Sequence, residues 1–242
     1  MLLMLRHKVA ADRPLTPSRD LVHDPRRHLP QSPHRRGCPR LRTLIAHGIR
    51  RDDGKRVILG VSCALSEAEV QWRGFLAGLK ERGIGIPDLV TSDAHSGRKA
   101  ALKAPLNGTP WQRCHFHLQK NAQEHLTKEH LKGKVASDIK VILNASERLN
   151  DFVKTYSESQ PKLAAWAKEN LPEGLAVFAF PEAHRRRLRT PNACENVNGQ
   201  IKKRTHVVGL FPSEESLLRL VTGVLIEISE TWKTGKTYLT SS

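Results

Sequence analysis

Apolar and polar positions alternate along the chain in blocks that predict short strands and amphipathic helices. Two apolar runs, residues 44–49 and 57–64, flank the polar stretch RRDDGK. The pair Asp53-Gly54 inside this stretch is a strong signal for a tight turn between antiparallel strands. We therefore predict a hairpin here, and we interpret Asp52 and Asp53 as turn residues rather than catalytic acids.

Two helices are predicted from apolar residues that recur at helical spacing, as in helices that cover a sheet. The first follows the hairpin: Ser66 and Glu69 fit a capping box at its start, and Gly83 supplies its end. Its apolar face is formed by Ala68, Trp72, Phe75, Leu76 and Leu79. The second begins at Ser213, and its apolar stripe is formed by Leu217, Val221, Val224, Leu225, Ile228 and Trp232.

The stretch LVTSDAHSGRKA, residues 89–100, predicts a short strand that ends at Asp93 and a helix capped by Ser96. Open α/β sheets bind ligands just beyond the carboxyl ends of their strands, which is where this carboxylate falls. Taken alone, Asp93 is more simply interpreted as a turn former. Residues 112–117 predict another short strand, which runs into a helix at 118–126.

The order of these elements predicts an α/β domain interrupted by a helical insertion. Residues 43–126 and 181–242 form the two parts of this domain, and residues 127–180 show a helical pattern without strand alternation. Residues 1–42 lack apolar periodicity and contain six of the chain's 14 prolines and ten Lys or Arg residues. We expect this segment to be disordered, because it buries too little surface to offset its ordering entropy. It is interpreted either as a basic arm on DNA or as a segment that is not the protein's proper N-terminus.

Composition points to a polyanionic partner. The formal net charge is +16 and the sequence pI about 10.1, an excess typical of proteins that bind nucleic acid. Aromatic residues make up only 5% of the chain, which favours contacts with the phosphate backbone over stacking on single strands. The four cysteines form no C-x-x-C pair, which fits a reducing cytoplasm, and no apolar run has the length of a membrane span.

A second candidate acid, Glu195, lies in a strongly basic part of the chain. Asn192 precedes it by three residues, so Glu195 alone fits the N3 acid of a capped helix. The functional interpretation is that the basic flank holds a DNA strand, while carboxylates beside it hold divalent cations. Hard oxygen ligands of this kind suit Mg²⁺ or Mn²⁺. The candidate DNA-binding residues are Arg185, Arg186, Arg187, Arg189, Lys202, Lys203 and Arg204.

Cys114 and His117 form a C-x-x-H pair between the two acids. One such pair is at most half of a zinc site, and no obvious second pair accompanies it. A buried structural cysteine beside a hydrogen-bonded histidine is the more frequent outcome for this spacing.

Several stretches resemble the catalytic part of bacterial transposases of the mutator type (IS256-like). They are VILGVSCALSEAEVQWRGFLAGLKERG, LVTSDAHSGRKAAL, WQRCHFHLQKNA, NLPEGLAVFAFPEAHRRRLRTPNACENVNGQIKKRT and LFPSEESLLRL, and the resemblance covers residues 44–239. It implies a ribonuclease H-like mixed sheet flanked by helices, with a helical insertion before the last catalytic residue. It also implies a D-D-E triad that binds two divalent ions, with a C-x-x-H beside the second acid.

Residue by residue, the resemblance carries the second Asp to Asp93, the Glu to Glu195, and the C-x-x-H to Cys114 and His117. It implies double-stranded DNA as the partner, both as element ends and as target. It further implies a homo-oligomer when the protein is intact, and a cytoplasmic, nucleoid-associated location.

The sequence departs from the family's pattern in front of the predicted hairpin. There the family has its first Asp on an apolar strand, whereas residues 28–42 read HLPQSPHRRGCPRLR and contain no Asp. Asp12, Asp20 and Asp24 lie in proline- and arginine-rich surroundings that do not match the motif. We therefore expect a truncated copy, without the region that recognises element ends, whose first forty or so residues are read out of frame.

Three hypotheses of function follow. The first is a transposase-derived enzyme domain that cuts a phosphodiester with metal-activated water and joins the freed 3′-hydroxyl to target DNA. The second is a non-catalytic DNA-binding remnant that pairs with intact transposase and interferes with it. The third is a general metal-dependent nuclease that cuts without regard to element ends.

Overall fold

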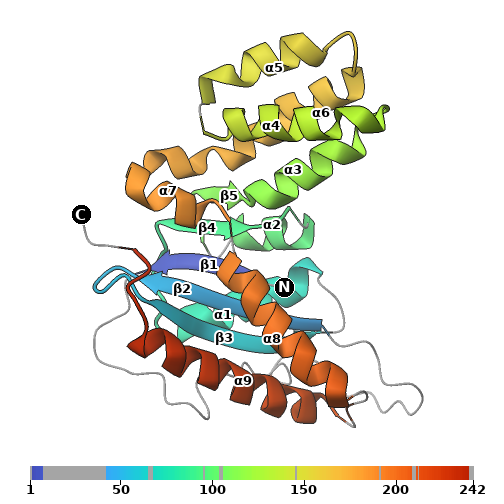
Figure 1. Ribbon diagram of the computed structural model, residues 1–242. Helices are drawn as coiled ribbons and strands as arrows, with labels where there is room; N and C mark the ends of the chain where they lie inside the picture. Colours follow the sequence, from blue (N-terminus) through green and yellow to red (C-terminus); the bar gives the residue numbers. More distant parts are fainter. Residues whose placement is uncertain are drawn as a thin grey trace. The chain divides into compact units, whose positions relative to one another are not determined.

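The computed structural model describes residues 2–7, 42–64, 68–94, 96–103, 106–144, 146–190, 192–208, 211 and 213–239 of a mixed α/β protein (Figure 1). The chain forms two compact units. The first comprises Met1–Val90, His95–Thr109 and Pro191–Ser242, and the second comprises Thr91–Ala94 and Pro110–Thr190. The domain boundaries predicted from the sequence stay a prediction.

The first unit is built on strands in the order β3-β2-β1-β4. β2 (Arg42–Arg50) and β3 (Arg56–Ala64) are antiparallel, with Leu44 opposite Ser62 and a register shift between Ala46 and His47. The hairpin predicted from the apolar pattern is therefore confirmed. β1 (Leu2–His7) pairs with β2 in parallel, and β4 (Leu89–Ser92) contributes its first two residues to this unit.

Strand β1 differs from the expectation of disorder for residues 1–42. Its six residues, LLMLRH, begin with an apolar run, and the neighbouring strand β2 supplies the backbone partners that a run of this length lacks by itself. The rest of that segment, with Asp12, Asp20 and Asp24, lies outside the described residues.

Helices cover the strands of the first unit. α1 (Glu69–Glu81) and α2 (Ser96–Lys103) pack on each other, while α8 (Asn192–Val208) packs on α9 (Glu214–Thr234), which also lies against β3. In Figure 1, α8 crosses in front of the strands and α1 lies behind them. The predicted apolar faces are confirmed at all positions but one: Ala68 precedes α1 and is exposed. The buried residues are Trp72, Phe75, Leu76, Leu79, Leu217, Val221, Val224, Leu225, Ile228 and Trp232.

Helix ends follow the predicted signals at two places and depart from them at one. Ser213 caps α9 in a capping box with Ser216, and Gly83 has the positive φ of 85° that ends α1. Pro161 occupies the first turn of α6 (Pro161–Asn170). The N-cap of α1 is Ala68 without a side-chain cap bond, and Ser66 lies outside the described residues.

Residues near the end of α9 close over the β2–β3 turn. The backbone N–H groups of Tyr238 and Leu239 both donate to the carbonyl of Gly54, at 2.9 and 3.0 Å. The Arg56 guanidinium lies 4.5 Å from the ring centroid of Trp232 and 5.0 Å from that of Tyr238. We call this arrangement, formed by Gly54, Arg56, Trp232, Tyr238 and Leu239, the clasp.

His47 packs edge-on against Trp232 with 5.5 Å between ring centroids, and it is fully buried. Burial, helped by the charge of Arg56, lowers the pKa of His47 to about 3. As the pH falls below 6.5, His47 becomes protonated in the unfolded chain but stays neutral in the folded chain. The free energy of unfolding is therefore highest above pH 6.5 and falls as the pH drops from there toward 3.

We expect the free energy of unfolding to fall by about 1.4 kcal/mol per pH unit below pH 6.5 on account of His47. Urea denaturation of the wild type and of His47→Gln between pH 7 and pH 5 measures this slope. His206→Gln is the matched control, because His206 is exposed at the end of α8. Equal slopes in the wild type and the His47 variant would contradict the assignment.

The second unit is almost entirely helical. The last two residues of β4 neighbour β5 (Trp111–Arg113), which leads directly into α3 (His115–Glu124). The strand predicted at 112–117 is thus shorter, because a helix already begins at His115. The other helices are η2 (Glu129–Leu131), α4 (Lys132–Ile142), η3 (Ser146–Arg148), α5 (Leu149–Tyr156), α6, η4 (Leu171–Gly174), η5 (Ala176–Ala179) and α7 (Glu182–Leu188).

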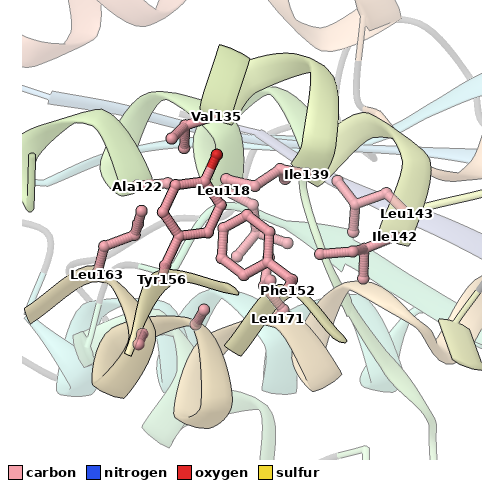
Figure 2. Close-up of a cluster of buried hydrophobic side chains, with 12 residues drawn as sticks. Leu118, Ala122, Val135, Ile139, Ile142, Leu143, Phe152, Tyr156, Leu163 and Leu171 are labelled. Carbon is pink, nitrogen blue, oxygen red and sulfur yellow. The ribbon is translucent and has the colours of Figure 1, made fainter. Parts of the chain in front are cut away.

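This unit has a hydrophobic core of its own. Figure 2 shows the rings of Phe152 and Tyr156 at its centre, 4.7 Å apart, and the Tyr156 hydroxyl donates to the Asp138 carboxylate at 2.6 Å. The core is completed by Leu118, Ala122, Val135, Ile139, Ile142, Leu143, Leu163, Ala164, Ala167 and Leu171. Within the described part of the chain, no helix has the length and apolarity needed to cross a membrane.

Candidate catalytic site

Asp93 directly follows the last residue of β4, as the sequence predicted, and is half-buried. The residue before it is held firmly: the Ser92 hydroxyl donates to the carbonyl of Asp93 at 2.9 Å and accepts from Trp111 Nε1 at 2.9 Å. The backbone that carries the carboxylate is therefore fixed by the neighbouring strand rather than left as a free turn.

Three segments of the second unit meet at the end of β4. The Cys114 N–H donates to the carbonyl of Ser92 at 2.8 Å, and the His115 N–H donates to the carbonyl of Arg189 at 3.0 Å. The Thr91 hydroxyl donates to the carbonyl of Leu188 at 2.8 Å. These bonds bring the backbone of Asp93, the start of the C-x-x-H and the end of the arginine run together.

Cys114 and His117 share the first turn of α3. Cys114 is the N-cap residue and is fully buried, and His117 is half-buried. The Cys114 Sγ lies within 4.8 Å of a ring nitrogen of His117, as residues three apart on one helix face do. Sulfur and imidazole nitrogen suit Zn²⁺ better than Mg²⁺, so the chemistry of this pair is not that of Mg²⁺ ligands.

Two of the predicted DNA-binding arginines are engaged within the second unit. The Arg185 guanidinium donates to the carbonyls of Phe180 (2.8 Å) and Phe178 (3.2 Å), and so holds the turn before α7. Arg189 donates to the Asn144 side chain at 2.8 Å. Arg186 is exposed on α7 and is better placed for a phosphate, while Arg187 is half-buried.

Glu195 lies in the first turn of α8, exposed to solvent and in the first unit. Further along the helix Lys202 and Lys203 are exposed. One guanidinium nitrogen of Arg204 donates to both carboxylate oxygens of Glu227 of α9, at 2.9 and 2.8 Å. Asp93 belongs to the other unit, so the convergence of the two acids on shared metal ions stays a prediction.

Sequence reasoning missed three residues around the C-x-x-H. Gln112, Arg113 and His115 are all buried, although their side chains are polar. Burial lowers the pKa of His115 to about 4, and Arg189 contributes in the same direction. The available signal was the two adjacent polar residues, Gln112 and Arg113, at the start of a short predicted strand. Polar side chains in such a strand are buried only where the fold supplies hydrogen-bond partners.

Comparison with known proteins identifies the family. The family model described as Transposase, Mutator family, matches residues 36–235. The chain belongs to this family. It is 45% identical over 202 residues to the transposase for insertion sequence element IS406 of Burkholderia multivorans, covering 81% of the chain and 52% of that protein. It is 35% identical over 201 residues to the transposase for ISRM5 of Rhizobium meliloti, covering 81% and 50%.

A third relative of this Mutator-family chain is the transposase for IS256 in transposon Tn4001 of Staphylococcus aureus. The two are 31% identical over 197 residues, which cover 78% of the chain and 50% of the relative. The chain thus spans about half the length of the curated relatives it matches.

Proposed function

We propose that this chain is the catalytic part of an insertion-sequence transposase with a ribonuclease H-like fold, in which Asp93 and Glu195 hold two divalent cations. Membership of the Mutator family is the observation that carries the proposal. A mixed sheet flanked by helices, with a helical unit between the two acids in sequence, supports it. Double-stranded DNA is the proposed substrate, and assembly with further copies on DNA is part of the proposal.

The donor chemistry fits magnesium or manganese. Asp93 and Glu195 offer carboxylate oxygens, and neither is fully buried, so each retains room for an ion and its water. When bound, the ions would activate water and stabilise the leaving oxygen of a phosphodiester. The chain's own side chains have two other proposed roles. Arg186, Lys202 and Lys203 bind the DNA backbone. Cys114 and His117 support the site beside Asp93.

The proposed site lacks one expected part. The D-D-E pattern requires an acid on a strand before β2. The strand that the structure has there, β1, contains no acid, and residues 28–42 contain no Asp. We therefore propose that the chain binds DNA but cleaves it poorly. The second candidate function, a non-catalytic DNA-binding remnant that interferes with intact transposase, is favoured by this same observation.

DNA binding is expected to weaken steeply with salt, since each neutralised phosphate lowers log K by about 0.9 per tenfold increase in salt. The double variant Lys202→Gln/Lys203→Gln should bind every duplex less tightly and reduce the salt slope by about 1.8. Titration of labelled duplexes at several salt concentrations measures both effects.

Lys162→Gln/Lys168→Gln is the matched control, because both lysines are exposed on α6. Binding that does not respond to salt would refute the proposed partner. An equal loss of affinity in both double variants would instead show that overall charge, rather than α8, attracts the DNA.

A further inference from the structure

The strand in front of the C-x-x-H carries two buried polar side chains. Gln112 is fully buried, and the Arg113 side chain is 5% exposed. Burying an amide and a guanidinium costs free energy unless every polar atom finds a partner. Apolar residues could occupy these two positions without that cost. The contacts of Gln112 and Arg113 therefore have to account for their burial.

Gln112 is bonded to the segment that follows α6. Its Nε2 donates to the carbonyls of Gly174 and Arg113, both at 2.8 Å, and its Oε1 accepts from the Val177 N–H at 2.8 Å. The side chain thus uses both ends of its amide and joins β5 to η4 and η5, which lie sixty or more residues away in sequence.

Arg113 is bonded to the same part of the helical unit. Its Nη1 donates to the Asn170 side chain at 2.6 Å and to the Glu173 carboxylate at 3.1 Å. In the Asn121 amide orientation that satisfies both neighbours, the Asn121 oxygen accepts from Arg113 Nη2 (2.9 Å) and its nitrogen donates to the carbonyl of His117 (3.1 Å). Arg113 is therefore linked through one side chain to the backbone of His117.

The third contact joins His115 to the same segment. His115 Nε2 donates to the carbonyl of Gly174 at 2.7 Å, which fixes the first turn of α3 against η4. A Cβ added at Gly174 would come within 2.5 Å of Leu118 Cδ1, so a larger residue there would displace the Leu118 side chain.

These contacts join the residues around the C-x-x-H to the segment 170–177, in addition to the backbone bond from Cys114 to β4. We propose that Gln112 and Arg113 are positioning residues, which use the segment 170–177 of the helical unit to fix the orientation of Cys114 and His117. They contact no reacting atom themselves. The inference rests on the proposed function, in which Cys114 and His117 stand beside the metal-binding acids, and it gives the helical unit a direct part in the geometry of the site.

The test compares Gln112→Met, which keeps the shape of the side chain and removes its three hydrogen bonds, with Tyr156→Phe. The control removes the partly buried hydrogen bond to Asp138 in the same unit, outside β5 and the segment 170–177. The ring signals of isotope-labelled histidine report the local geometry, with His117→Gln to assign the His117 signal and exposed His130 as the internal reference. Titration with Mn²⁺ alone then reports metal proximity, through broadening of the same signal.

We expect Gln112→Met to shift the His117 ring signal and to raise the Mn²⁺ concentration needed to broaden it by about tenfold or more. Tyr156→Phe should leave both within about twofold of the wild type, because a loss of stability alone does not reorient the motif. An unchanged His117 signal in Gln112→Met, or an equal change in Tyr156→Phe, overturns the inference.

Two other results, a variant that does not fold and a wild type that does not respond to Mn²⁺, also have a defined meaning. If Gln112→Met does not fold by circular dichroism, Asn170→Ala, which removes one acceptor of Arg113, is judged by the same criteria. If Mn²⁺ fails to broaden the His117 signal of the wild type, the metal part of the proposed function fails. The positioning inference is then decided by the His117 ring signal in the variants.

Discussion

Cleavage of element-end DNA by this chain is expected to be weak, and to rise by about 10³-fold or more when an Asp-bearing strand replaces β1 beside β2. The proposed reaction needs two ions, one to activate the nucleophile and one at the leaving oxygen. Two carboxylates can bind an ion, but without a third acid the pair of ions is held loosely. Several kcal/mol of transition-state stabilisation are lost as a result.

The measurement is strand cleavage with Mg²⁺ or Mn²⁺, comparing the chain as it stands with the version in which an Asp-bearing strand replaces β1. Activity in the latter should disappear in Asp93→Ala and in Glu195→Ala. Asp88→Ala is the control acid, since Asp88 is ion-paired with Arg51 outside the proposed site. Efficient cleavage by the unaltered chain that is abolished by Asp93→Ala would show that another acid supplies the third ligand.

Replacement of Gly54 by alanine is expected to lower the free energy of unfolding by about 3 kcal/mol. Gly54 has a φ of 63°, a conformation that costs an L-residue energy by itself. An added Cβ would also lie 1.7 Å from the carbonyl oxygen of Leu239, so the clasp must open or the turn must move. Both penalties arise from one methyl group.

Gly83→Ala separates the two penalties. Gly83 has a φ of 85° at the end of α1, but a Cβ there meets nothing within 4 Å, so only the backbone penalty of about 1 kcal/mol is expected. Urea denaturation of the two variants measures the difference. Equal losses would mean that the clasp contributes nothing to the stability of the turn.

The parts of the fold that sequence predicted well are those set by local chemistry. The Asp53-Gly54 turn, the stripe on α9 and its Ser213 cap all depend on residues within a few positions of one another. The same logic failed at β5, where three residues gave too little pattern to show that a helix begins at His115. Strand β1 was missed because its stability comes from pairing with β2, a partner distant in sequence.

The candidate site shows the same division. A strand that ends in an acid indicated the place of Asp93, because the signal lies in adjacent residues. No local pattern could indicate that Arg185 bonds backbone carbonyls in the turn before α7, or that Arg204 pairs with Glu227. A run of basic residues shows charge, but not which of those charges the fold already pairs. Of the seven candidate DNA-binding residues, Arg186, Lys202 and Lys203 are the exposed ones.

The clasp also sets an order of events during synthesis. The β2–β3 hairpin is made early, but the residues that bond the Gly54 carbonyl come about 184 positions later (238 minus 54). At a synthesis rate of 5–20 residues per second, roughly 10 to 40 seconds pass between synthesis of the turn and synthesis of these partners. The second unit, with Pro110–Thr190 continuous in sequence, emerges entirely within that interval. The first unit, although it supplies the N-terminal strands, is therefore the last to be completed.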